Sequence, residues 1–238
     1  MILSIIVPLF NEETTIEFLL NKVLSQKNVS QVIVVDDAST DNSVEKLKFI
    51  GDERVLILKH EKNLGKGAAI RTAQSFVNGD IVIIQDADLE YNPDEYPKLI
   101  DPILKGKADV VFGSRFQSGE SRRVLYFWHY LGNRILTFYS NMMTDLNLSD
   151  METCYKAIRS ELFKGILIQE SRFGFEPEIT GKLAAHGARF YEVSISYDGR
   201  TYEQGKKIRP KDGIRALWCV IKFNKFRMKR RLTRRGQV

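Results

Sequence analysis

Ile81-Val82-Ile83-Ile84-Gln85-Asp86-Ala87-Asp88 joins a continuous apolar run to two carboxylates, and Glu90 follows two residues later. A continuous rather than alternating apolar run is typical of a strand that is buried on both faces. Carboxylates this close together repel one another, and a site that keeps them together usually neutralises them with a divalent cation. The stretch therefore predicts a buried strand that ends in a metal site. A solvated acidic turn is the alternative.

Apolar runs of strand length alternate with amphipathic segments over the first half of the chain. Strands are expected at residues 3–10, 31–37, 55–60, 80–86 and 109–114, and helices at residues 14–25, 41–49, 67–77 and 94–104. This alternation predicts a doubly wound α/β half, with a mostly parallel sheet, over residues 1 to about 115.

Ligands of such sheets bind beyond the carboxyl ends of the strands. Polar residues follow four of the expected strands at this edge: Asn11 and Glu12, Asp36 and Asp37, Asp86 and Asp88, Ser114 and Arg115. One of the two aspartates after the second strand can accept a hydrogen bond from a ribose hydroxyl. The loop Gly65-Lys66-Gly67 precedes a helix, where backbone amides can meet an anion. It matches neither a Walker loop nor a dinucleotide-binding fingerprint.

The second half reads as an acceptor-side elaboration of the first. After the link 117–123 we expect an aromatic-rich helix over 124–143, a strand or turn at 151–158, a helix at 176–186, a strand at 189–196, a polar loop at 198–212 and a basic helix from 214 to about 232. We therefore divide the chain into a catalytic domain, residues 1–212, and a basic amphipathic tail, residues 213–238.

The positive charge is concentrated in the tail. Residues 204–238 hold 13 of the 36 Lys and Arg residues and one of the 30 acidic residues, or +12, which leaves −6 for the first 203 residues. Such asymmetry suggests an anionic partner, either nucleic acid or acidic lipid, and a solubilising disordered tail is the alternative. Two distant cysteines and no signal sequence lead us to expect a cytoplasmic protein, and no apolar stretch approaches the roughly 20 residues that cross a bilayer.

Five motifs together resemble family 2 glycosyltransferases with a GT-A fold, and within that family the dolichyl-phosphate mannosyltransferases and polyprenyl-phosphate glucosyltransferases. They are Ile6-Val7-Pro8-Leu9-Phe10-Asn11-Glu12-Glu13, Val35-Asp36-Asp37-Ala38-Ser39-Thr40-Asp41, Gly65-Lys66-Gly67, Asp86-Ala87-Asp88 and Gly113-Ser114-Arg115. The resemblance implies an inverting enzyme that transfers a hexose from a nucleotide diphosphate sugar to a polyprenyl phosphate, with Mg²⁺ or Mn²⁺ as cofactor.

The resemblance also implies roles for individual residues. The nucleotide sugar is expected to contact Pro8, Phe10, Glu12, Val35, Asp37, Lys66, Asp86 and Ala87. The metal is expected to bind Asp88 and Glu90, although Glu90 stands where the family often has Gln, and Phe10 stands where a Tyr is common. The catalytic residues are expected to be Asp88, Arg115, Asp150, Arg200 and Lys206, the last two as a mobile basic pair that closes over the donor and acceptor phosphates.

The acceptor decides whether a general base is needed. A lipid phosphate is already an anion, because its second ionisation lies near pH 6. A sugar hydroxyl needs a base, for which Asp150 or Glu152 is the candidate. The aromatic stretch 126–139 either lines a lipid groove, with Arg134 near the acceptor phosphate, or is a buried core helix. We interpret the basic end of the chain as peripheral attachment to an anionic membrane, on its inner face.

Three other functions compete with this interpretation. One is a glycosyltransferase that acts on a saccharide hydroxyl in cell-surface polysaccharide synthesis. Another is a nucleotidyltransferase, but its glycine-rich, basic signature near the amino terminus is absent from the sequence. The third is a nucleic-acid-binding protein, which would leave the acidic strand ends unexplained. We therefore expect no nucleic-acid partner.

Overall fold

The computed structural model describes residues 2–124, 126–201, 203–205 and 210–235. Seven strands form one sheet: β1 (Leu3–Leu9), β2 (Val29–Asp36), β3 (Val55–Lys59), β4 (Ile81–Ile84), β5 (Val110–Ser114), β6 (Lys156–Arg159) and β7 (Phe190–Ser194). The helices that flank it are α1 (Ile16–Leu24), α2 (Ser43–Leu47), α3 (Lys66–Gln74), the 3-10 helix η1 (Pro93–Glu95), α4 (Tyr96–Leu104), α5 (Phe127–Thr144), α6 (Ser160–Lys164), α7 (Phe175–Ala185) and α8 (Pro210–Arg235).

The strand order is β3-β2-β1-β4-β6-β5-β7, and every neighbouring pair is parallel except the two that β6 makes with β4 and β5. The carboxyl ends of the parallel strands therefore share an edge with the amino end of β6. Residues that precede β6 thus reach the same edge as residues that follow β4. The expected mostly parallel sheet, flanked by helices, is confirmed.

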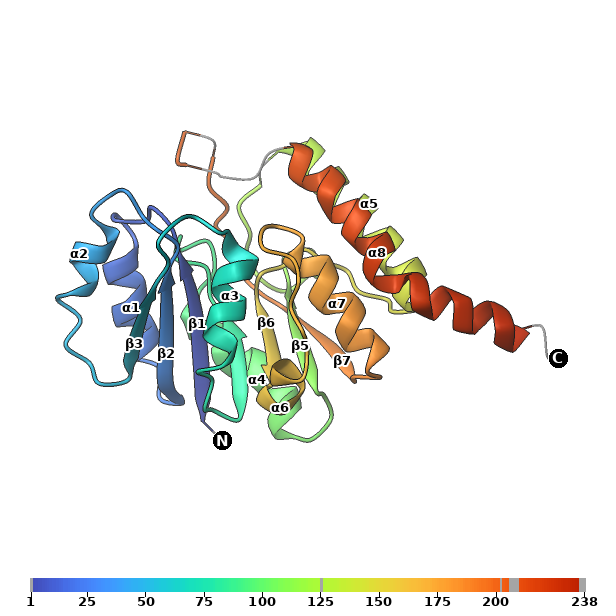
Figure 1. Cartoon of the computed structure of the whole chain (residues 1–238), viewed down its shortest axis with the longest axis horizontal. Coiled ribbons are helices and arrows are strands. Elements are labelled where there is room, and N and C mark those ends of the chain that lie inside the picture. Colours follow the sequence, from blue (N-terminus) through green and yellow to red (C-terminus); the bar gives the residue numbers. More distant parts are fainter. Residues whose placement is uncertain (1, 125, 202, 206–209, 236–238) are drawn as a thin grey trace.

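Burial on both faces explains the continuous apolar runs of the central strands. All four residues of β4 are buried, as are Ile5, Ile6 and Val7 of β1 and the apolar residues of β2. Helix α3 contacts β1 and β2 on one face, and α4 covers β5 on the other face (Figure 1). The core therefore lies on both sides of the sheet, and the polar residues are left at the edge where the strands end.

The second half of the chain adds a helical layer beside this sheet. Helices α5 and α8 lie side by side, and α8 also contacts α7 (Figure 1). Only Thr137, Ser140 and Thr144 of α5 are buried, whereas Trp128 is 77% and Phe138 64% exposed. The alternative of a buried core helix for this aromatic stretch is therefore wrong. Within the described ranges, no helix combines the length and apolar character that crossing a bilayer requires.

Most predicted elements are present within a few residues of their expected bounds. The segment expected as a strand or turn forms the short strand β6, and the expected basic helix is α8, which begins at Pro210. The sequence did not predict η1 or α6. Both are very short, and so they lack the periodicity from which a helix is recognised.

Candidate active site

The loops at the carboxyl edge of the sheet adopt strained backbone conformations. Asn11, Ala38 and Leu89 have φ values of 50°, 60° and 63°, and each lies shortly after β1, β2 or β4. Non-glycine residues avoid the left-handed region, and where they are held in it they cluster at functional sites. The edge predicted to carry the chemistry is therefore also the edge where the backbone is forced into unusual turns.

Arg200 is bound by carboxylates from two strand ends. Its guanidinium donates to both oxygens of Glu12, at 2.9 and 3.1 Å, and to Asp88 Oδ2 at 3.0 Å. Glu12 follows β1 and Asp88 follows β4, whereas Arg200 lies on the loop after β7. The structure thus brings together three residues that the sequence places 188 positions apart at their extremes.

Glu90 fixes the loop that carries Arg200. One of its carboxylate oxygens accepts the backbone amide of Arg200 at 2.7 Å, and the other accepts the hydroxyl of Tyr197 at 2.7 Å. The Glu90 backbone carbonyl accepts the Asp198 amide at 3.1 Å. The loop is therefore closed over the carboxylates after β4 by bonds to both backbone and side chain.

The donor atoms around Arg200 suit a hard divalent cation. Glu12, Asp88 and Glu90 offer carboxylate oxygens, which Mg²⁺ and Mn²⁺ prefer. Burial, together with the charges of Asp86 and Glu90, raises the pKa of Asp88 to about 7, as expected of carboxylates that lack enough compensating positive charge. Among the residues that the structure describes, no three His, Cys, Asp or Glu side chains form a ready metal-binding group. The carboxylate oxygens are therefore ligands of the kind that a divalent metal prefers, whereas their present spacing suits the guanidinium of Arg200.

Lys66 lies between two acidic residues beside this cluster. Its ammonium is 2.8 Å from Asp86 Oδ1 and 3.1 Å from Glu176 Oε1. Burial opposes the charged form, but Asp86 and Glu176 outweigh it and raise the pKa of Lys66. Lys66 is the first residue of α3, and Glu176 lies in the first turn of α7. The ion pairs of Lys66 therefore bring the amino ends of these two helices together beside Asp86. Sequence reasoning missed Glu176, because an acidic residue in a first helical turn signals only a favourable helix end.

Glu152 lies next to Glu176 at the same edge. Burial and the charge of Glu176 raise the pKa of Glu152 to about 8. Glu152 Oε1 and Glu176 Oε2 are both shielded from solvent and have no hydrogen-bond partner among the described residues. A carboxyl group that stays protonated near neutral pH can donate a hydrogen bond as well as accept one.

Arg115 is held by Asp150 in a bidentate ion pair. Arg115 Nε is 2.6 Å from Asp150 Oδ2, and its NH2 group is 2.7 Å from Oδ1. The Arg115 backbone amide also donates to Asp150, at 3.0 Å. Asp150 is fully buried, and the guanidinium stacks near the ring of Tyr197 at 5.2 Å from its centroid. Both oxygens of Asp150 are therefore occupied by Arg115.

The residues expected to hold the nucleoside lie on adjacent strands. Pro8 of β1 is paired with Val35 of β2, and the backbone oxygen of Ala87 accepts the Thr15 hydroxyl at 2.7 Å. Phe10 follows β1 and is partly buried. Asp37 is buried and accepts the amides of residues 64 and 65 at 2.8 and 2.6 Å. Asp37 thus anchors the loop that leads to Lys66, and its contact with a nucleoside stays a prediction.

Two predicted residues fall outside this cluster. Arg134 is exposed on α5, where its neighbour Asn133 reaches Arg115 at 3.5 Å. Lys206 lies outside the described residues. Sequence reasoning overlooked Arg122 and Arg123, which line a groove with Glu90 and Tyr197. Their position in a polar link gave no signal, because adjacent arginines in such links are usually solvated.

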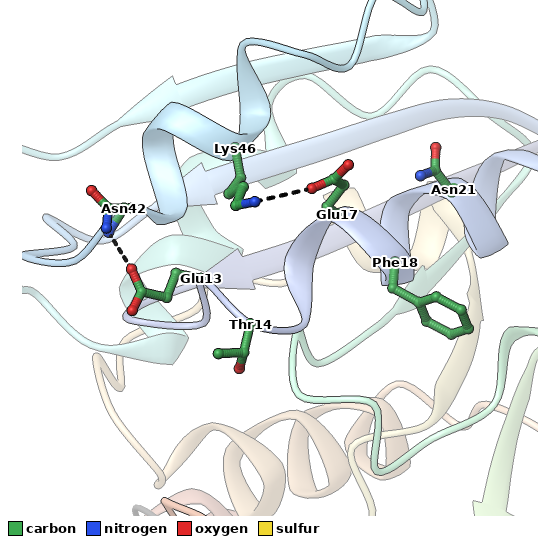
Figure 2. Close-up of a pocket in the computed structure, with 7 residues that line it drawn as sticks. All are labelled: Glu13, Thr14, Glu17, Phe18, Asn21, Asn42 and Lys46. Carbon is green, nitrogen blue, oxygen red and sulfur yellow. Dashed lines mark hydrogen bonds and ion pairs between the residues drawn. The ribbon is translucent and has the colours of Figure 1, made fainter.

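A second surface depression shares Phe18 with this groove but is otherwise lined by different residues. It is formed around α1 and the start of α2, and Figure 2 shows its lining side chains. Lys46 contacts Glu17 at 3.4 Å and Asn42 donates its backbone amide to Glu13 at 2.9 Å. None of the residues predicted to bind the donor lines this depression. The strand-end cluster, rather than this depression, is therefore the candidate active site.

Comparison with known proteins agrees with this geometry. Residues 4–167, which run from the second residue of β1 past β6 and include the strand-end carboxylates, match the model of glycosyl transferase family 2. The chain belongs to this family. The resemblance inferred from the five motifs is thereby confirmed.

Two relatives of this family 2 chain differ in how they align. Undecaprenyl-phosphate 4-deoxy-4-formamido-L-arabinose transferase of Edwardsiella ictaluri is 27% identical over 210 residues, which cover 85% of this chain and 62% of the relative. The chain thus spans less than two thirds of that enzyme. An uncharacterized protein of Methanocaldococcus jannaschii is 27% identical over 222 residues and is matched over 90% of its length.

Solved structures support the GT-A fold. Glucosyl-3-phosphoglycerate synthase from Mycobacterium tuberculosis, in complex with Mn²⁺, uridine diphosphate and glucosyl-3-phosphoglycerate, has a TM-score of 0.74 at 19% identity. The similarity covers 94% of this chain and 80% of that chain. At this identity the likeness concerns the fold, and the predicted GT-A architecture is confirmed.

Proposed function

We propose that this family 2 glycosyltransferase is an inverting enzyme that transfers a hexose from a nucleotide diphosphate sugar to a polyprenyl phosphate. The observation that carries the proposal is the convergence of Glu12, Asp88 and Glu90 on one cationic group, beside the Lys66–Asp86 ion pair, at the carboxyl edge of the sheet. Carboxylates that can bind a metal lie there beside basic side chains that can bind phosphate oxygens, and a diphosphate with its metal needs both.

The residues of the edge have separate roles in this proposal. Asp88 and Glu90 would hold a divalent cation, which would stabilise negative charge on the diphosphate. Lys66 keeps Asp86 in position through their ion pair. Arg115 faces the transferred sugar and its phosphates, and Asp150 fixes its orientation through the bidentate pair.

Arg200 meets charge that grows during the reaction. In a single inverting displacement the leaving nucleotide diphosphate gains negative charge, and a preorganised guanidinium stabilises that charge more in the transition state than in the ground state. Arg200 lies on the loop after β7, and its guanidinium is 3.0 Å from Asp88, which supports this role. Lys206 is proposed to act with it.

The engaged state of Asp150 favours a phosphate acceptor. Both of its oxygens bind Arg115, so Asp150 is better placed to orient that arginine than to accept a proton from a hydroxyl group. A lipid phosphate is already ionised and needs no such base. Arg122 and Arg123 line the neighbouring groove and add positive charge where an anionic acceptor can enter.

The exposed aromatic rings of α5 provide a surface for the lipid. Phe127, Trp128 and Phe138 are all more than half exposed, and α8 beside them carries Arg215 and Lys222. Aromatic and basic side chains together are typical of helices that lie at a membrane interface. We propose peripheral attachment to an anionic leaflet through this helical layer, on the cytoplasmic side.

A product assay tests the proposal. Labelled nucleotide sugars would be incubated with the protein and Mn²⁺ or Mg²⁺, with and without a short-chain polyprenyl phosphate. We expect a labelled lipid product only when lipid and metal are both present. Transfer to soluble saccharides alone, or no dependence on the lipid, would reject the acceptor assignment while leaving the family assignment intact.

One observation favours a second acceptor class. Glu152 Oε1 is buried without a hydrogen-bond partner among the described residues, and a raised pKa makes the ionised form of Glu152 a stronger base toward a sugar hydroxyl. If the acceptor is a saccharide hydroxyl, Glu152→Gln abolishes transfer. If it is a lipid phosphate, the same variant retains most of its activity.

A further inference from the structure

The carboxylates proposed to bind the metal already hold a positively charged group. Arg200 places two guanidinium nitrogens within 2.9 to 3.1 Å of Glu12 and Asp88, and its Nε lies 3.7 Å from Glu90. A divalent cation would bind oxygens of the same carboxylates. Arg200 in this position therefore opposes binding of a metal to Asp88 and Glu90, because two positively charged groups would lie side by side at these carboxylates.

The contacts of Arg200 leave part of its side chain unsatisfied. Its Nε is shielded from solvent and has no acceptor within hydrogen-bond distance among the described residues. Guanidinium groups present five N–H donors in a fork that matches carboxylate or phosphate oxygens. A buried donor without a partner costs free energy. The observed contacts thus leave one N–H group of Arg200 without an acceptor, and a phosphate oxygen is an acceptor of the kind that this group binds.

The charges of the carboxylate cluster also favour replacement of Arg200 by a divalent cation. Glu12, Asp88 and Glu90 carry three negative charges when ionised, and Arg200 supplies one positive charge. Lys66, a positive group beside the cluster, is engaged by Asp86 and Glu176. Among the residues that the structure describes, the cluster therefore keeps an excess of negative charge, which favours a cation of higher valence in place of the guanidinium.

We propose that Arg200 is an internal counter-cation of the Glu12, Asp88 and Glu90 cluster, which divalent metal displaces so that the guanidinium is released toward the donor diphosphate. The inference rests on the proposed function. Metal loading and the repositioning of a phosphate-binding arginine then become a single exchange. Metal must compete with Arg200 for the cluster. The apparent affinity for metal is therefore the intrinsic affinity multiplied by the fraction of molecules in which Arg200 has left the cluster.

The exchange also links the metal to the loop after β7. The same carboxylate of Glu90 accepts the backbone amide of Arg200 and the hydroxyl of Tyr197. A metal that binds Glu90 competes with these two donors for the electron density of the carboxylate. We therefore expect metal alone, without nucleotide, to loosen the backbone around Arg200.

Binding of Mn²⁺ to the full chain in the absence of nucleotide tests the exchange. Arg200→Ala should bind Mn²⁺ at least ten-fold more tightly than the unchanged protein. Arg200→Lys should fall between the two, because an ammonium still supplies the charge but not the fork. The matched control is Arg189→Ala, which removes one positive charge from an ion pair with Asp109 before β5, at the opposite edge of the sheet. It should leave Mn²⁺ affinity within about two-fold, since distant surface charges are screened.

Hydrogen exchange supplies a second readout that does not depend on activity. Mn²⁺ should speed amide exchange of Arg200 in the unchanged protein. Equal or weaker Mn²⁺ binding by Arg200→Ala, or an unchanged exchange rate, would overturn the proposal. If the unchanged protein and Arg200→Ala both bind Mn²⁺ only with a nucleoside diphosphate and with equal affinity, the exchange fails while the proposed metal dependence stands. If neither binds Mn²⁺ under any condition, both fail.

Discussion

The guanidinium of Arg115 and the carboxylate of Asp150 form a bidentate ion pair in which the aspartate is completely buried. The pair joins the end of β5 to the segment that leads into β6, so it connects the two halves of the chain at the candidate active site. A charge in such a place is costly when its partner is removed.

Asp150→Asn should therefore damage both stability and turnover. Asparagine keeps the shape of the side chain but leaves Arg115 without its counter-charge, at a cost of roughly 3 kcal/mol in the free energy of unfolding. Turnover should fall more than donor affinity, because a misoriented Arg115 no longer meets the transition-state charge. The control is Asp52→Asn, which disrupts a partly exposed pair with Arg54 and should change little. Chemical denaturation measures the stability of both variants, and steady-state kinetics measure their turnover. Unchanged stability and turnover of Asp150→Asn would contradict the role of Asp150 in orienting Arg115.

Asp88→Ala should abolish transfer without unfolding the protein. The side chain lies on a loop after β4 and contacts Arg200 rather than the apolar core, so its loss opens no core cavity. Activity should fall roughly a hundred-fold or more, since several kcal/mol of charge stabilisation depend on the metal. Asp101→Ala, in the exposed ion pair with Lys105, is the matched control. Near-normal transfer by Asp88→Ala in chelator-treated buffer with metal restored would reject Asp88 as a ligand.

Glu152 should make stability depend on pH in the neutral to alkaline range. Its pKa is raised from 4.5 to about 8, so the folded state holds a proton that the unfolded state has released. The free energy of unfolding then falls as pH rises from about 4.5 through 8, because the folded state binds more protons there. Glu152→Gln should remove this loss, roughly 2.5 kcal/mol between pH 6 and 9.

Thermal unfolding across this pH range measures the effect of Glu152. The difference in melting temperature between Glu152→Gln and the unchanged protein should grow toward pH 9. Glu161→Gln, at an exposed position of α6, should show no such trend. Parallel curves for Glu152→Gln and the unchanged protein would mean that Glu152 is ionised in the folded state.

Deletion of the chain after Lys225 should weaken binding to anionic vesicles without removing catalysis. The deleted segment carries no acidic residue and six basic ones: Arg227, Lys229, Arg230, Arg231, Arg234 and Arg235. Basic residues near an anionic leaflet contribute about 1 kcal/mol each at best, and salt screens them. High salt should therefore release the intact protein, while transfer to a detergent-soluble polyprenyl phosphate survives the deletion.

Co-sedimentation also separates the tail from the aromatic helix. Trp128→Ala combined with Phe138→Ala removes exposed apolar area from α5, and the resulting loss of binding should persist at high salt. Binding that resists both the deletion and salt would assign attachment to α5 alone. Binding that resists all of these changes would remove the membrane from the proposed function.

The central strands and their polar ends could be predicted from local sequence. The apolar runs of β1, β2 and β4 are continuous because both faces are buried, and the carboxylates follow them directly along the chain. The contact between Arg200 and Glu12 could not be predicted, because it depends on how the loop after β7 folds back across the sheet. Family resemblance assigned these two residues to donor phosphates and nucleoside, and gave no reason to expect them to bind each other.

The partnership of Lys66 with Glu176 was hidden for a similar reason. Lys66 was recognised from its glycine-rich loop, but Glu176 lies more than a hundred residues later in a helix whose position is set by tertiary packing. The antiparallel direction of β6 was also unreadable, since a four-residue strand carries no signal of its direction. Long-range pairing, rather than local propensity, therefore determines the part of the site that sequence left open.

The reversed strand β6 limits how this protein can be recombined with its relatives. It lies between β4 and β5, so the strand that brings Asp150 and Glu152 to the site also joins the two halves of the sheet. A chimera that exchanges everything after residue 115 would insert a foreign strand between two native ones and replace Asp150 opposite Arg115. The two halves of the candidate site are consequently not separable modules, and a functional exchange must carry β5, β6 and the loop after β7 as one unit.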